Sequence, residues 1–201
     1  MKRLSRYHRT LESVAGLGVT YIASRELAEY NWVTSAQVRK DLSSFGNFGK
    51  RGMGYPVEGL KQELEQILGL DRRWSVVLVG VGNIGRALLA FGEFRHRGFD
   101  IVACFDIDPK KIGHGLRGIP IHHFDDLPDL VKQHGAEIGI IAVPTVSAQE
   151  VCNRLLDAGI RAILNFAPVR LEVPDGVTVR YEDMSIELEA LSFALTSGRS
   201  V

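Results

Sequence analysis

The chain has 201 residues, 45% of them hydrophobic, which is enough to form two compact domains and excludes a disordered protein. Its net charge is zero, no apolar signal region opens it, and its apolar runs are far shorter than the roughly 20 residues of a membrane span, so we expect a cytoplasmic protein. Cys104 and Cys152 lack the spacing of a zinc site or a disulfide framework, so we expect no metal and interpret both as buried apolar side chains.

The zero net charge hides an asymmetry between the two parts of the chain. Residues 1–73 hold 12 Lys and Arg against 8 Asp and Glu, whereas residues 74–201 hold 12 against 16. This distribution suggests that the first part meets a polyanion and the second does not. We therefore expect a first domain over residues 1–73.

Helices are predicted through most of this first domain. Apolar residues recur at helical spacing over residues 6–16, a short helix capped by Ser24 follows through residue 29, and a further helix runs from Thr34 or Ser35 to Leu42. The tight connection between the last two gives them the spacing of a helix-turn-helix motif.

The last of these helices carries side chains that can read DNA. Val38 and Leu42 are expected to face the core, which leaves the polar residues on other faces. Gln can bond adenine in two places, Arg can do the same with guanine, and Lys40 is expected to meet phosphate. The residues that we assign to DNA binding on this helix are Ser35, Ala36, Gln37, Arg39, Lys40 and Ser43.

Residues 45–55 combine four glycines, two cations and three aromatic residues, a composition that predicts a tight hairpin wing. Lys50 and Arg51 at its tip would enter a narrow minor groove or hold phosphates, and Gly52 and Tyr55 are assigned to the same surface. The alternative is a solvated amphipathic helix followed by an ordinary loop. A helix over residues 57–70 is expected to close the domain.

The second domain, expected over residues 74–182, opens with a dinucleotide-binding pattern. An apolar strand over residues 74–79 leads into Gly80, Val81, Gly82, Asn83, Ile84 and Gly85, and a helix is predicted over residues 86–94. The next strand, 101–105, ends at Asp106, which lies 21 residues beyond Gly85. This is the Rossmann fingerprint, in which Asp106 would accept hydrogen bonds from the adenine ribose and favour NAD over NADP.

Strands and helices continue to alternate, which predicts an α/β fold with a doubly wound sheet of six strands: residues 74–79, 101–105, 119–121, 138–143, 162–166 and 177–181. Ligands bind outside the carboxyl ends of such strands. Besides the fingerprint we assign to the cofactor Ile107, Lys111, Val143, Pro144, Thr145, Asn165, Ala167 and Pro168, the last six outside Lys111 near the nicotinamide half.

No substrate domain remains, so we do not expect an enzyme. Two alternatives stay open: a small NAD-dependent oxidoreductase, and a repressor that binds another nucleotide such as coenzyme A.

Five segments together resemble the redox-sensing transcriptional repressor family Rex: residues 35–43, 48–55, the fingerprint 80–85, 105–109 and 165–168. The resemblance runs through essentially the whole chain, in order. It implies a homodimer whose winged helices read double-stranded, inverted-repeat operator DNA. It also implies that NADH releases the DNA, while NAD⁺ competes weakly.

The resemblance further implies that residues 183–201 form a helix exchanged between subunits. Apolar residues lie on more than one face of this segment, although packing within one chain is the alternative. Arg9, Phe91 and Asp183 occupy the positions that couple the cofactor to domain orientation, with Phe91 in place of the family's Tyr. Met184 replaces an aromatic ring and is assigned to the cofactor pocket of the partner.

Overall fold

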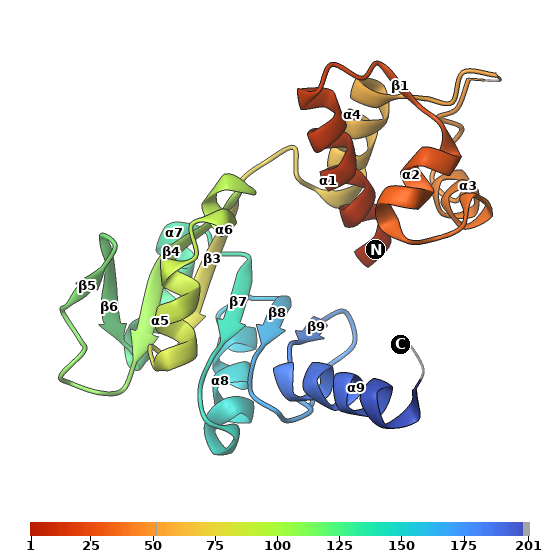
Figure 1. Cartoon of the computed structure of the whole chain (residues 1–201). Coiled ribbons are helices and arrows are strands. Elements are labelled where there is room, and N and C mark those ends of the chain that lie inside the picture. The colour runs from red at the N-terminus through yellow and green to blue at the C-terminus, as the bar shows by residue number, and fades with distance from the viewer. Residues whose placement is uncertain (51, 199–201) are drawn as a thin grey trace. The chain divides into compact units, whose positions relative to one another are not determined.

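The structure, a computed structural model, describes residues 1–50 and 52–198, so that Arg51, expected at the wing tip, lies outside the described residues. The chain divides into two compact units, Met1–Arg72 and Arg73–Val201, which are described separately (Figure 1). None of the helices in the described part of the chain is long and apolar enough to cross a membrane.

The first unit is a small helical domain with a two-stranded sheet. Its helices are α1 (Lys2–Gly16), α2 (Ser24–Asn31), α3 (Ser35–Ser43) and α4 (Val57–Leu68), and its strands β1 (Tyr21–Ile22) and β2 (Tyr55–Pro56) pair antiparallel. The fully buried core side chains come from all four helices and include Tyr7, Leu11, Leu27, Val38 and Leu64. The predicted winged-helix fold is confirmed.

Local chemistry explains how the two helices of the helix-turn-helix begin. The Thr34 hydroxyl accepts a hydrogen bond from the Gln37 N–H at 3.1 Å and caps α3. The prediction that Ser24 caps α2 is wrong, because Ala23 holds the cap position and the Glu26 carboxylate accepts from the Ala23 N–H at 2.7 Å. The Ser24 hydroxyl instead accepts from Arg39 of α3.

The second unit is built on a seven-stranded sheet of order β5-β6-β4-β3-β7-β8-β9. Six strands are parallel: β3 (Trp74–Val79), β4 (Phe99–Asp106), β6 (Ile119–His123), β7 (Ile138–Ile141), β8 (Ala162–Asn165) and β9 (Thr178–Tyr181). They are the six predicted strands, and they confirm the doubly wound sheet. The additional strand β5 (Gly115–Leu116) runs antiparallel to β6.

Helices cover both faces of this sheet (Figure 1). Residues of α7 (Leu127–His134) and α8 (Thr145–Asp157) pack with one set of strand residues, and residues of α5 (Asn83–Ala90) pack with the alternate set. The prediction of one helix over residues 86–94 is wrong. Phe91 is extended, with φ −80° and ψ 93°, and a separate turn of helix, α6 (Glu93–His96), follows Gly92, a poor helix former.

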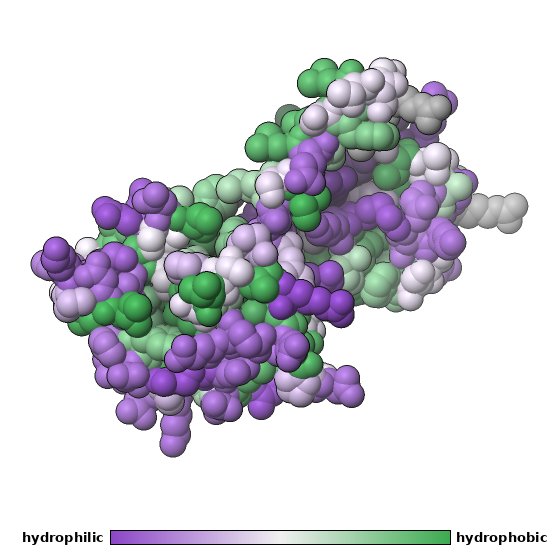
Figure 2. Space-filling model, turned by 90° about the horizontal axis from the view of Figure 1, so that it is seen from below, coloured by the Kyte–Doolittle hydropathy of each residue, from purple (hydrophilic) through white to green (hydrophobic). Residues whose placement is uncertain are grey.

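The last helix, α9 (Met184–Ser197), has no buried residue. Its large apolar side chains are all more than half exposed: Met184, Ile186, Leu188, Leu191, Phe193 and Leu195. In Figure 2, green hydrophobic side chains lie in the open among purple polar ones. A helix that is apolar on all sides requires a covering surface, which the described part of one chain does not provide.

Candidate DNA-reading and dinucleotide-binding sites

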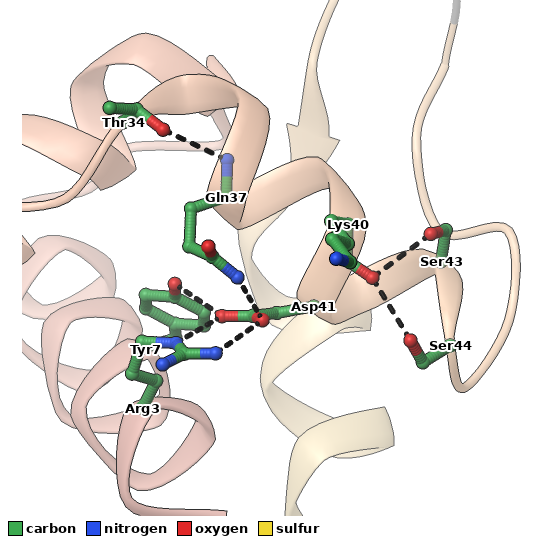
Figure 3. Close-up of polar contacts among 8 residues, drawn as sticks. All are labelled: Arg3, Tyr7, Thr34, Gln37, Lys40, Asp41, Ser43 and Ser44. Carbon is green, nitrogen blue, oxygen red and sulfur yellow. Dashed lines mark hydrogen bonds and ion pairs between the residues drawn. The ribbon is translucent and has the colours of Figure 1, made fainter.

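The recognition helix α3 presents one continuous exposed face. Val38 and Leu42 are at most 1% exposed and fix the helix on the core. Ala36, Arg39, Lys40 and Ser43 are exposed, whereas Ser35 and Gln37 are half-buried at the edge. The Lys40 carbonyl accepts from the hydroxyls of Ser43 and Ser44, both at 3.0 Å (Figure 3). Two cations and two small residues can therefore approach a groove together.

A carboxylate on the inner side of α3 ties this helix to α1 (Figure 3). Asp41 accepts from Arg3 Nε at 2.6 Å and Nη2 at 2.8 Å, and from the Tyr7 hydroxyl at 2.9 Å. Gln37 Nε2 donates to the same carboxylate at 2.6 Å. Mainly through the hydrogen bonds from Arg3, this network holds the pKa of Asp41 well below its usual range. Burial and the same carboxylate raise the pKa of Tyr7 to about 12.

The glycine-rich segment between α3 and β2 forms a tight turn. The Lys50 N–H donates to the Gly54 carbonyl at 2.7 Å, and Gly52 and Gly54 have φ of +80° and +89°. A Cβ at Gly54 would collide with the Ile22 carbonyl, so only glycine lets the turn pass this close to β1. Lys50 Nζ donates to the Tyr21 hydroxyl at 3.1 Å, while the Tyr55 ring is 9% exposed and belongs to the core.

The fingerprint turn between β3 and α5 has the geometry of a phosphate cradle. Gly80 has φ +96°, and a Cβ there would meet the Ala142 carbonyl. A Cβ at Gly85 would collide with the Gly80 carbonyl, whereas one at Gly82 would meet nothing within 4 Å. The open space at Gly82 adjoins the start of α5, where the first helical N–H groups lack intrahelical partners and attract negative charge.

Asp106 at the end of β4 is 9% exposed and bonded on both oxygens. It accepts from the Val81 N–H, the Asp108 N–H and Lys111 Nζ, each at 2.9 Å. Burial alone would raise its pKa, but Lys111 and the two backbone N–H groups outweigh burial and lower the pKa of Asp106. The side chain is therefore an anionic acceptor at neutral pH.

A cavity of about 570 Å³ joins the fingerprint turn to Asp106. Of the residues assigned to the cofactor, it is lined by Gly80, Gly82, Asp106, Ile107, Lys111, Val143 and Pro144. Five further lining residues were not singled out from the sequence: Asp108, Phe124, Ser147, Glu150 and Val151. Their positions depend on how α8 and the 3₁₀ turn Phe124–Asp126 (η1) pack on the sheet, which the local pattern does not show.

The other assigned residues lie outside the lining of this cavity. Val81 and Gly85 are buried in the turn, Asn83 and Ile84 are exposed on α5, and Thr145 opens α8. Asn165 is fully buried: its Nδ2 donates to the carbonyls of Ala167 and Val169, and its Oδ1 accepts from the Ala167 N–H. Asn165 thus shapes the turn that carries Ala167 and the exposed Pro168.

The three residues assigned to coupling all have accessible side chains or a local structural role. Arg9 is exposed on α1, and Phe91 is 53% exposed, with its ring edge-on to Phe94 at 5.2 Å. Asp183 caps α9 by accepting from the Ser185 N–H at 2.9 Å, and this contact with Ser185 lowers its pKa. Met184 follows directly and is 70% exposed.

No group of His, Cys, Asp and Glu suited to a metal ion occurs among residues 1–50 and 52–198. What the residues do form is an exposed basic recognition helix in one unit and an anion-binding dinucleotide cleft in the other. Together they define a DNA-binding regulator with a nucleotide-binding domain.

Comparisons with known proteins give the family. Residues 71–169 match a family model described as "CoA binding domain", and residues 1–43 match one described as "Putative DNA-binding protein N-terminus". The redox-sensing transcriptional repressor Rex of Carboxydothermus hydrogenoformans is 49% identical over 96% of this chain and 93% of the relative. The chain therefore belongs to the Rex family of redox-sensing transcriptional repressors, and it is a regulator rather than an enzyme.

Two solved structures of RSP, a Rex-family repressor, share this fold. The complex of RSP with NAD⁺ and operator DNA is 39% identical, covers 98% of this chain and 91% of that chain, and has a TM-score of 0.93. The complex of RSP with NADH is 38% identical, covers 98% and 92%, and has a TM-score of 0.88.

Proposed function

We propose that this chain represses transcription by binding inverted-repeat operator DNA as a homodimer, and that it leaves the DNA when NADH binds. In this proposal residues 1–73 read the DNA, residues 74–182 bind the cofactor, and residues 183–201 pair two subunits. The observation that carries the proposal is the union, in a chain of the Rex family, of an exposed basic recognition helix with an NAD-type cleft. Its place of action is the cytoplasm, where operator DNA and the NAD(H) pool meet.

On the DNA side, α3 lies in the major groove and the segment around Lys50 contacts the backbone or the minor groove. Arg39 and Lys40 supply the charge, while Ala36 and Ser43 leave room for close approach. The complex of RSP with operator DNA supports this role, since that protein shares the fold. Phosphate contacts make the binding salt-dependent.

On the cofactor side, the chain's residues fit a dinucleotide. Gly82 leaves open space where a pyrophosphate requires close backbone approach, and the N-terminus of α5 favours its charge. Asp106 accepts hydrogen bonds from the adenine ribose, and Ile107, 73% exposed beside it, offers an apolar surface to the adenine.

NADH and NAD⁺ differ in the charge of the nicotinamide ring. A neutral reduced ring enters an apolar pocket at lower cost than a cationic oxidised ring. Val143 and Pro144, with Met184 of the partner subunit, form that pocket in our proposal. A preference for one redox state becomes a switch because the two dimer arrangements differ in their affinity for the operator.

The dimer follows from α9, whose apolar side chains have no cover within the described part of one chain. Exchange of this helix between subunits buries both copies and brings Asp183 and Met184 to the partner's cleft. Arg9 and Phe91 then connect the cleft to the reading domain. Phe91 cannot donate a hydrogen bond as Tyr does, so this contact is apolar in the present chain.

Coenzyme A is the competing ligand, because the matched family model carries its name. The adenosine of coenzyme A bears a 3′-phosphate and that of NADP a 2′-phosphate, and either would face the anionic Asp106. The unphosphorylated ribose of NAD(H) meets no such repulsion. Titration calorimetry with NADH, NADPH and coenzyme A separates the three ligands.

The test of the proposal is displacement from DNA. A fluorescently labelled operator duplex is bound to the full chain and titrated with NADH or NAD⁺ while anisotropy is recorded. NADH is expected to release the duplex at lower concentration than NAD⁺. Retention of the complex at saturating NADH would refute the sensor function.

A further inference from the structure

The side chain of Gln37 on α3 is held at one end only. Its Nε2 donates to Asp41 Oδ1 at 2.6 Å, and no donor in the described part of the chain reaches its Oε1. The residue is half-buried and adjoins the exposed Ala36, whose methyl group leaves space beside it. The carbonyl end of the amide is therefore available to a ligand.

Asp41 decides which end of the amide is held. Arg3 donates twice to this carboxylate and Tyr7 once, so Asp41 is anchored from α1 before Gln37 is considered (Figure 3). An ionised carboxylate accepts hydrogen bonds and cannot donate them. The Gln37 amide must therefore turn its nitrogen toward Asp41, because the reverse orientation would place two acceptors against each other.

We propose that Asp41 is a specificity-determining positioning residue, which makes Gln37 an acceptor-only reader of DNA. The inference rests on the proposed function, since it requires α3 to lie in the major groove. On that edge the amines N6 of adenine and N4 of cytosine are the base donors, whereas guanine and thymine present acceptors. Gln37 therefore selects adenine or cytosine at the base that it faces.

This inference changes the expectation drawn from the sequence alone. A two-bond contact between Gln37 and adenine requires both the carbonyl and the amine of the side chain. The amine is already committed to Asp41. The single remaining contact discriminates by donor against acceptor and does not separate adenine from cytosine.

The experiment is operator selection from a randomised duplex library with the full chain, followed by sequencing. The wild type is expected to enrich adenine or cytosine at one symmetric position of each half-site. Gln37→Ala is expected to lose that preference, by roughly 5- to 150-fold in relative affinity, and to keep the preferences at all other positions. Asp41→Asn, whose amide can donate to Gln37 Oε1, is expected to admit guanine or thymine at the same position.

A second variant separates specificity from folding. Arg3→Lys keeps a positive charge but loses the two-pronged contact, so it is expected to lower stability and affinity while leaving the base preference unchanged. If Asp41→Asn does not fold, the base enriched by the wild type and the Gln37→Ala profile decide the question.

The outcomes are distinct. A uniform loss of affinity in Gln37→Ala, with every base preference intact, overturns the inference and makes Gln37 a structural residue. Enrichment of guanine or thymine at the Gln37-dependent position overturns it as well. If the wild type enriches no inverted repeat, the proposed function fails, and the inference fails with it.

Discussion

Asp106→Ala removes the group that we expect to hold the adenine ribose. The carboxylate is 9% exposed, and hydrogen bonds to a charged, buried acceptor each contribute about 1.5–3 kcal/mol. Loss of one ribose contact therefore weakens NADH binding by roughly 10- to 150-fold. The Val81 N–H and Lys111 Nζ also lose their acceptor, which destabilises the second unit by about 1–3 kcal/mol.

Two titrations measure this effect. Calorimetry gives the NADH affinity, and anisotropy with cofactor-free protein gives the operator affinity, which is expected to be unchanged. Asp126→Ala is the matched control, since Asp126 is an exposed carboxylate of the same unit whose side chain makes no capping bond. An equal fall in both affinities would make Asp106 a structural residue, and an unchanged NADH affinity would remove it from the ribose site.

Three further predictions concern the cradle, the dimer and the reading head. Gly85→Ala, whose Cβ would strike the Gly80 carbonyl, is expected to abolish NADH binding in calorimetry, whereas Gly92→Ala, with open space at its Cβ, leaves it unchanged; equal behaviour of the two would contradict the cradle. Leu191→Asp on α9 is expected to convert dimers to monomers in sedimentation equilibrium, and a persistent dimer would place the interface elsewhere. Because Asp41 has a depressed pKa, its stabilising contribution is present above the ordinary carboxyl pKa of 3.8 and is lost as the pH falls below it. The difference in urea unfolding between wild type and Asp41→Asn should thus be constant from pH 7 to about pH 5 and shrink at pH 3; a difference that grows at pH 3 would refute this.

The sequence predicted best what depends on local pattern. The six parallel strands alternate with helices, and the fingerprint follows a strand directly, so chain order alone indicates a doubly wound sheet. The strands β1 and β5 were not predicted, because each has two residues and too little pattern to recognise. The turn at Arg117 and Gly118, both with positive φ, is what turns β5 back onto β6.

Contacts between distant residues could not be predicted from spacing. The pairing of Arg3 with Asp41 joins positions 38 apart, and only the packing of α1 on α3 reveals it. The four-residue spacing of Gln37 and Asp41 was visible in the sequence, but which group of the amide is bound depends on Arg3 and Tyr7. Likewise, the fully buried Asn165 uses its amide within its own turn, a role that its position after a strand does not disclose.

The central claim is that cofactor and operator compete through one conformational equilibrium. Binding free energies are reciprocal, so the factor by which NADH weakens operator binding must equal the factor by which operator weakens NADH binding. Calorimetric titration of NADH into the dimer, free and saturated with operator duplex, measures the second factor. We predict weaker NADH binding in the presence of operator, by the factor found in the anisotropy experiment. The same NADH affinity in both titrations would contradict the account.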